Sequence, residues 1–213
     1  MNEVRINKDS NLELVTVYEV SKVLSSSLDL QKTLRGVLNV LTSHLQVQRG
    51  MVALLQEDGF LQVVAATGLE QSEMAQGRFR PGEGVMGSIL KAGVPAVVPD
   101  IAKEALFLNR TGARKNKGKG IAFIGVPIKI GRETIGVLSF DRENEGEAGG
   151  FGGDVRFLTM VANLIGQSVR LHRKVAEDRA NLMQEKIRLQ SELHNLYSIE
   201  NVVGQSKVMQ EVF

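Results

Sequence analysis

Apolar residues recur every three or four positions over the first 45 residues, and this spacing predicts two helices before any strand. Ser10 is the expected N-cap of the first helix, in which an apolar face is traced by Leu14, Val17, Tyr18, Ser21 and Leu24. Asp29 can cap the second, whose apolar stripe is Leu30, Leu34, Val37, Leu38, Leu41 and Leu45. Both helices are therefore expected to bury one face.

The pattern then changes to short apolar runs separated by turn residues, as is typical of antiparallel strands. Residues 49–56 and 60–67 flank a turn that contains Asp-Gly, which predicts a β-hairpin. A second hairpin is predicted from residues 121–130 and 134–141. Pro127 lies inside the first strand of this hairpin, and it indicates an edge position or a local bulge because proline cannot donate to the ladder.

The region between the two hairpins predicts a short helix over Gly84 to Lys91, which Gly93 ends, and a short strand over Val94 to Val98. Mostly antiparallel strands with helices segregated to one face make an α+β domain.

The last third of the chain predicts one long helix, for which Asp154 is the expected N-cap. Val155 to Tyr197 contains no proline and, after Gly166, no glycine, so the helix would be about 60 Å long. Its second half is charged and has apolar residues seven apart, at Val175, Leu182, Leu189 and Leu196. This heptad spacing favours a parallel two-stranded coiled coil over a single solvated helix, although Lys186 lies where a further apolar residue is expected.

The composition excludes several kinds of functional site. The 213 residues are 43% apolar, carry a formal net charge of +2, and include no cysteine, which excludes disulfides, thiolate metal sites and thiol nucleophiles. No apolar run approaches the roughly 20 residues that span a bilayer, so we expect a cytoplasmic chain without a membrane partner. The three histidines lack metal-ligand spacing and no Ser/His/Asp set is identifiable, so we expect neither a metal nor enzyme activity in this segment.

Basic residues gather between Arg110 and Lys119 without an acidic neighbour. This stretch is not a phosphate-binding loop, because Gly118-Lys119 is followed by Gly120 where serine or threonine is needed. It also lacks the helix or the interleaved aromatic residues that favour DNA binding. A solvated loop and a lid over an anionic ligand both remain open.

Four blocks of the sequence resemble successive segments of a GAF domain: RPGEGVMGSILKAGVPAVVPDI, FLNR, FIGVPIKIGRETIGVLSFDR and RFLTMVANLIGQSVRLHR. Over about Ser10 to Arg173 the chain resembles the regulatory domain of nitrogenase-gene activators of the NifA, VnfA and AnfA type. The final ENVVGQSKVMQEVF resembles the beginning of the AAA+ ATPase domain of sigma-54-dependent activators. The implied divisions are a GAF sensor at 1–173, a coiled-coil linker at 174–198 and a truncated AAA+ start at 199–213.

The resemblance implies a five- or six-stranded antiparallel sheet, with helices on one face and a ligand pocket on the other. The pocket would be roofed by Ala105 to Gly120, and its candidate lining residues are Phe79, Arg80, Val98, Asp100, Phe107, Asn109, Arg110 and Phe123. An arginine fork binds a carboxylate or phosphate bidentately, which suits 2-oxoglutarate or a cyclic nucleotide. The alternatives are plain core phenylalanines and surface arginines that pair with Asp100.

The implied function is a sensor that controls a downstream ATPase through ligand or partner binding and rearrangement of a homodimer. Expected dimer contacts are Val161, Leu164, Val175, Leu182, Leu189 and Leu196. Sigma-54 RNA polymerase and enhancer DNA would bind to domains outside this chain. A regulatory protein is a further candidate partner. Competing hypotheses are a GAF sensor of a histidine kinase or phosphodiesterase, and a dimerisation module that binds nothing. Redox sensing is disfavoured because cysteine is absent.

Overall fold

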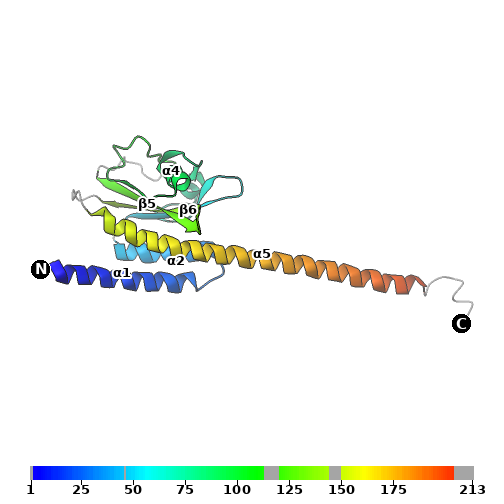
Figure 1. The fold of residues 1–213 in the computed structure, drawn as a ribbon. Helices are drawn as coiled ribbons and strands as arrows, with labels where there is room; N and C mark the ends of the chain where they lie inside the picture. Colours follow the sequence, from blue (N-terminus) through cyan, green and yellow to red (C-terminus); the bar gives the residue numbers. More distant parts are fainter. Residues whose placement is uncertain (1, 46, 113–119, 144–149, 204–213) are drawn as a thin grey trace, which may run out of the picture. The chain divides into compact units, whose positions relative to one another are not determined.

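The computed structural model describes residues 2–45, 47–112, 120–143 and 150–203. Its strands form one antiparallel sheet in the order β3-β2-β1-β6-β5-β4 (Figure 1). The strands are β1 (Arg49–Leu55), β2 (Leu61–Thr67), β3 (Arg78–Phe79), β4 (Ala96–Val98), β5 (Ile121–Ile130) and β6 (Glu133–Glu143). The helices are α1 (Asn2–Leu24), α2 (Leu30–Leu45), α3 (Gln71–Gln76), α4 (Gly84–Ala92) and α5 (Phe151–Val203). The predicted α+β class is confirmed.

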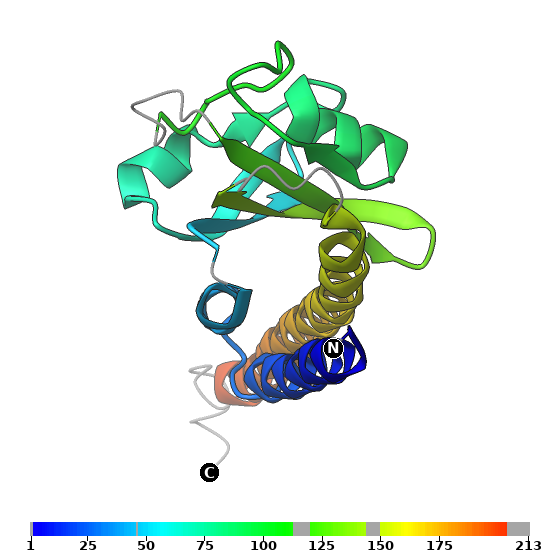
Figure 2. The same cartoon turned by 90° about the vertical axis from the view of Figure 1, so that its left-hand side faces the viewer.

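Contacts divide the chain into two units, Met1–Arg170 and Leu171–Phe213. In the first unit, α1, α2 and the beginning of α5 lie on one face of the sheet, and α4 lies on the other (Figure 2). Successive residues of a strand point to opposite faces of the sheet. Here both sets of residues are apolar, so the sheet is apolar on both faces. Val137 of β6 packs on the α4 side, whereas Leu138 packs on the α5 side.

Both predicted hairpins are present, as β1–β2 and β5–β6. β4 pairs only with Phe123 to Gly125, so within the described residues Pro127 lies where β5 has no strand on that side. The register of β5 against β6 also shifts between Ile128 and Lys129. β5 is an inner strand of the sheet, and Pro127 pairs in register with Val137 of β6. The predicted edge position holds only in that β4 does not reach Pro127, and the irregularity lies one residue beyond it.

The predicted start of α1 is wrong, and its predicted buried face is found only in part, because Val17 and Leu24 pack against the core whereas Leu14 and Tyr18 do not. The helix begins at Asn2, so Ser10 lies inside it, and residues 2–24 contain no glycine or proline that would delay the start. Leu14 and Tyr18 are 68% and 69% exposed, whereas Thr16 and Val20 are buried. The side of α1 that packs against its neighbours carries Thr16 and Val20, with Val17, Val23 and Leu24 partly buried beside them.

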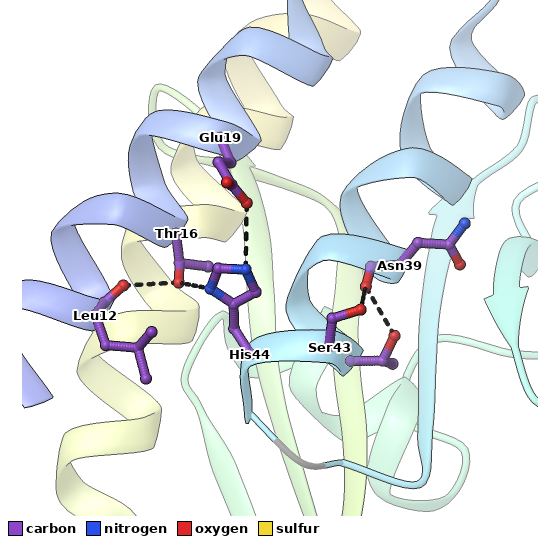
Figure 3. Close-up of polar contacts among 7 residues, drawn as sticks. Leu12, Thr16, Glu19, Asn39, Ser43 and His44 are labelled. Carbon is purple, nitrogen blue, oxygen red and sulfur yellow. Dashed lines mark hydrogen bonds and ion pairs between the residues drawn. The ribbon is translucent and has the colours of Figure 1, made fainter.

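A polar contact fixes α1 on α2 (Figure 3). The buried Thr16 hydroxyl oxygen lies 2.7 Å from the Leu12 carbonyl oxygen and 2.7 Å from His44 Nδ1. His44 Nε2 lies 3.2 Å from Glu19 Oε2. His44 therefore has a structural role between the two helices, because both of its ring nitrogens contact α1.

The second helix follows its prediction closely. The backbone N–H of Lys32 donates to Asp29 Oδ1 at 3.0 Å, which confirms Asp29 as the cap. Within the predicted apolar stripe, Leu34, Val37, Leu38 and Leu41 are wholly buried.

The long helix is also found, but Asp154 is not its N-cap. α5 begins at Phe151, and Asp154 lies in its first turn, where its Oδ2 is 2.5 Å from Arg142 Nη1. Burial raises the pKa of Asp154, and the Arg142 guanidinium opposes that shift. Further along, α5 approaches β5 closely at Gly166, where an added Cβ would lie 2.2 Å from the Lys129 carbonyl oxygen.

The second unit is described up to residue 203, and those residues are the C-terminal part of α5. Its apolar positions are open to solvent: Val175 is 40% exposed, Leu182 72% and Leu189 47%. Leu196 lies in α5 among residues whose side chains are not described, and most of the predicted AAA+ start (204–213) lies outside the described residues.

The corrected face of α1 predicts opposite outcomes for two identical substitutions. Val20→Ala removes two methyl groups from a fully buried site, and we expect it to lower the free energy of unfolding by about 1.5–3 kcal/mol. Val15→Ala, in the same helix but at a position 46% exposed, should change it by less than about 0.5 kcal/mol. Urea denaturation measures both, and equal losses would contradict this packing.

Candidate functional site

The candidate site lies on the face of the sheet opposite α1, α2 and α5, beside a tight turn over Arg80 to Glu83. The Gly82 N–H donates to the Gly87 carbonyl of α4 at 2.7 Å, and the Glu83 N–H donates to the Arg80 carbonyl at 2.9 Å. The Arg80 N–H in turn donates to Glu83 Oε2 at 2.8 Å. A Cβ at Gly87 would lie 2.2 Å from the Arg80 carbonyl oxygen, so only glycine lets the turn pack this closely.

A cavity of about 10 Å³ lies on this face of the sheet. That volume holds about one water molecule. Its lining is apolar apart from one threonine and consists of Met51, Phe79, Val85, Met86, Phe107, Leu108, Thr111 and Phe123. The rings of Phe107 and Phe123 meet edge to face, with centroids 5.3 Å apart. The protein's own side chains therefore fill the space that a ligand would need.

The covering segment, which we define as Phe107–Thr111, supplies three of the lining residues. Leu108 rests against Gly84, where an added Cβ would lie 2.9 Å from Leu108 Cδ1. Arg110 Nη2 forms an ion pair with Glu83 Oε1. The segment is thus held over the cavity by apolar contacts and by one ion pair to the turn that precedes α4.

Glu83 is the acidic partner in this closure. The Arg80 backbone N–H and, to a smaller extent, the Arg110 guanidinium lower the pKa of Glu83. Its carboxylate is therefore ionised at neutral pH. Since the pKa is lowered, the contribution of this contact to closure is present at neutral pH and is lost as the pH falls through the lowered pKa.

The structure brings three of the eight predicted ligand residues together, because Phe79, Phe107 and Phe123 all line the cavity. Val98 is buried in the same apolar cluster without lining the cavity. Arg80 is exposed, and its guanidinium carbon lies 5.8 Å from the centre of the Phe60 ring.

The remaining predicted residues lie outside the cavity. Asp100 Oδ1 accepts the Ala102 N–H at 3.0 Å, and its Oδ2 lies 3.4 Å from Lys103 Nζ. Arg110 pairs with Glu83 rather than with Asp100, the partner weighed from the sequence. Asn109 lines a separate open hollow of about 350 Å³, together with Ile101, Ala102, Lys103, Glu104, Ala105 and Phe107. The basic residues at 113–119 lie outside the described residues.

Sequence reasoning missed five lining residues and the acidic partner: Met51, Val85, Met86, Leu108, Thr111 and Glu83. β1 is buried on both faces, so its sequence gave no alternation that would assign Met51 to the pocket side. Glu83 belongs to the RPGEG block, and its position just before α4 was the available signal.

The expected dimer residues fall into two groups. Val161 is 0% exposed and packs in the cluster between α5 and the sheet, so its side chain contacts its own domain and offers no surface to a second chain. Leu164 is partly buried against the same cluster. The remaining residues of that set whose side chains are described, Val175, Leu182 and Leu189, are exposed.

In the part of the chain that the structure describes, no His, Asp and Glu side chains gather in a group that could hold a metal. Over the same residues, no helix combines the length and apolarity that a membrane span requires.

The first unit is an antiparallel sheet with long helices on one face and a closed apolar cavity on the other. It has the α+β class predicted from the sequence. The chain belongs to the GAF domain family, whose model matches residues 29–169.

Among curated proteins, the chain is 51% identical over 208 residues to the Nif-specific regulatory protein of Herbaspirillum seropedicae, covering 97% of this chain and 38% of that protein. It is 57% identical over 206 residues to the Nif-specific regulatory protein of Azospirillum brasilense, covering 95% and 33%. It is 34% identical over 203 residues to the nitrogen fixation protein VnfA of Azotobacter vinelandii, covering 94% and 39%. The chain thus spans about a third of the length of these relatives.

Among solved structures, the chain is similar to the GAF domain of A. aeolicus NLH2 in an inactive state. The TM-score is 0.68 and the identity 28%, covering 76% of this chain and 98% of that chain.

The packing of the turn against α4 predicts a contrast between two helical glycines. Gly87→Ala forces the Arg80 carbonyl away from α4, and we expect it to destabilise the first unit by about 2 kcal/mol or more. Gly153→Ala, in the first turn of α5 with no atom within 4 Å of the added Cβ, should be neutral or stabilise by up to about 1 kcal/mol. Thermal unfolding distinguishes them, and a harmless Gly87→Ala would contradict the close contact.

Proposed function

We propose that this chain is the regulatory domain of a sigma-54-dependent transcriptional activator of nitrogen-fixation genes, acting in the cytoplasm. Similarity to Nif-specific regulatory proteins over nearly the whole chain supports this role. Since the chain spans about a third of those relatives, the AAA+ ATPase and DNA-binding parts belong to the rest of the protein. Sigma-54 RNA polymerase and enhancer DNA are the partners of those parts. We divide this chain into a sensor (1–173), a coiled-coil linker (174–198) and the AAA+ start (199–213).

The observation that carries the sensor proposal is the closure of the apolar cavity by the covering segment and its Arg110–Glu83 ion pair. The covering segment would have a closed state and an open, displaced state. A ligand or partner that binds only the open state shifts the equilibrium toward it, and the difference between its affinities for the two states sets the size of that shift. The consequence for the protein is a change in how two copies pair, which permits or blocks assembly of the ATPase.

The ligand that suits this arrangement is a small anion, such as 2-oxoglutarate or a cyclic nucleotide. Its carboxylate or phosphate would take the place of the Glu83 carboxylate on Arg110, because the guanidinium fork binds such groups in the same geometry. Its less polar part would take the volume that the Phe107 ring occupies against Phe123. The ligand and the protein's own side chains therefore compete for the same contacts.

The one-water volume of the cavity also favours a second candidate, a dimerisation module whose pocket stays closed. In that case regulation would come from a partner protein bound outside the pocket. The two candidates differ in a single measurable property, which is whether any small anion stabilises the folded domain.

A thermal-shift panel with 2-oxoglutarate, cyclic AMP, cyclic GMP and amino acids tests the sensor proposal. A ligand bound by the native state alone stabilises it by about 2.7 kcal/mol at a hundred times its Kd. For a unit of this size that is roughly 5–10 °C in melting temperature. We expect such a shift with one of the anions. No shift with any compound at millimolar concentration would favour the closed module instead.

Glu83→Gln tests the closure itself. The substitution keeps the size of the side chain and removes its charge, so Arg110 loses its ion-pair partner. We expect faster amide hydrogen exchange in residues 107–112 and tighter binding of any anion found in the panel, because less closure has to be undone. Glu57→Gln, an exposed glutamate in the β1–β2 turn, is the matched control. Unchanged exchange in Glu83→Gln would show that the ion pair does not hold the segment.

A further inference from the structure

Ser139, in the middle of β6, has a buried hydroxyl group without a hydrogen-bond partner. The residue is 0% exposed, and among the buried side-chain nitrogen and oxygen atoms that the structure describes, Ser139 Oγ is the one that makes no hydrogen bond. A buried hydroxyl that finds no partner lowers the stability of a fold. The packing of the free domain therefore gives no reason for a serine at this position.

This hydroxyl lies on the cavity side of the sheet. Successive residues of a strand point to opposite faces. Leu138 packs on the side of α2 and α5, whereas Val137, and with it Ser139, faces the other side. In the register of the sheet, the neighbours of Ser139 are Met51 on β1 and Gly125 on β5. Since Met51 lines the cavity, Ser139 belongs to the floor beneath it.

The aromatic rings that fill the cavity lie close to this floor. A Cβ on Gly125 would lie 2.9 Å from Cε1 of Phe123, so the Phe123 ring lies over the neighbour of Ser139. Phe107 meets the Phe123 ring edge to face. Displacing Phe107 with the covering segment removes this contact, and the Phe123 ring can then turn away from the floor.

An acid and a base lie on the same face of the sheet, next to Ser139. Asp141 is two residues further along β6, about 7 Å away at the usual rise of a strand, and it is 1% exposed. Arg49 is its register partner on β1, and Arg49 Nη1 lies 4.0 Å from Asp141 Oδ2, beyond hydrogen-bond distance. A carboxylate has about four acceptor positions, so Asp141 can accept further donors.

We propose that Ser139, Asp141 and Arg49 bind the head group of an α-amino acid when the covering segment is displaced. The ammonium group would donate to Ser139 Oγ and to the Asp141 carboxylate. The α-carboxylate would pair with the Arg49 guanidinium, whose side chain is 26% exposed and whose fork suits two oxygens. This inference rests on the sensor of the proposed function and names the chemical class of its ligand.

An acidic side chain extends the match to the rim of the cavity. The γ-carboxylate of glutamate would replace the Glu83 carboxylate on Arg110, and its methylene groups would take the volume of the Phe107 ring. 2-Oxoglutarate has the same two carboxylates but carries an oxo group in place of the ammonium group. The oxo oxygen cannot donate, so it would face the Asp141 carboxylate without a hydrogen between them. The floor therefore favours the amino acid over the oxo acid.

Glutamate and 2-oxoglutarate are a matched pair of probes for this floor. Isothermal titration calorimetry on the whole 213-residue chain measures the Kd of each. We expect glutamate to bind roughly tenfold tighter or more, because a site that accepts hydrogen bonds from a ligand discriminates against an analogue without the donor.

Two variants assign the preference to the floor. Ser139→Ala removes the unpartnered hydroxyl, so it should leave the melting temperature of the free protein unchanged or raise it, while it weakens glutamate binding about tenfold. Ser88→Ala, at an exposed position of α4, is the control that should change neither. Asp141→Asn should bring the two Kd values close together. Their ratio is informative even if this variant is less stable than the wild type.

2-Oxoglutarate binding as tightly as glutamate would overturn the inference, and so would a Ser139→Ala variant that binds glutamate as tightly as the wild type. Failure of the sensor proposal gives a different result. A thermal shift with 2-oxoglutarate or a cyclic nucleotide but not with glutamate leaves the sensor standing and contradicts the amino-acid site. No shift with any compound contradicts both.

Discussion

The sheet is apolar on both faces, and the rest of the first unit follows from the need to cover both. β1 and the centres of β5 and β6 are buried residue after residue, so neither face can be left to water. The stripe of α2 and the apolar first half of α5 cover one face with regular helices. Among the described residues, the other face is covered by the short helices α3 and α4 and by the irregular segment after β4, and single side chains such as Phe107 complete the covering.

This unequal covering explains why the pocket face is the one suited to change. Displacing a helix that is buried along its length breaks many contacts at once. Phe107 and Leu108 instead cover the cavity from a segment without regular structure, so displacing them breaks fewer contacts. The Arg110–Glu83 pair adds a charged contact at the border of that segment, where a competing anion can reach it because both side chains are partly exposed. A closed pocket in this family member is thus compatible with sensing, provided that closure and ligand use the same groups.

The sequence predicted those features that depend on neighbouring residues. The α2 stripe, the Asp29 cap, both hairpins and the presence of one long C-terminal helix depend on local spacing and turn chemistry, and all were found. The long helix is longer than predicted, since it runs from Phe151 to Val203. The buried face of α1 was predicted only in part: Val17 and Leu24 pack against the core, but the burial of Thr16 depends on its contact with His44, 28 residues away. Likewise, Arg110 could be singled out as a candidate, but its partner Glu83 is 27 residues distant and only the fold brings them together.

We propose that the covering segment has a closed state that Glu83 holds in part. Because the chain has no cysteine, spin labels can be placed at Asn109→Cys on the segment and Ser88→Cys on the exposed side of α4. Pulsed electron spin resonance then gives the distance distribution between them. We expect one narrow distance in the free protein and an added longer population when Glu83 is also replaced by glutamine. An identical, single distribution with and without the Glu83 carboxylate would contradict it.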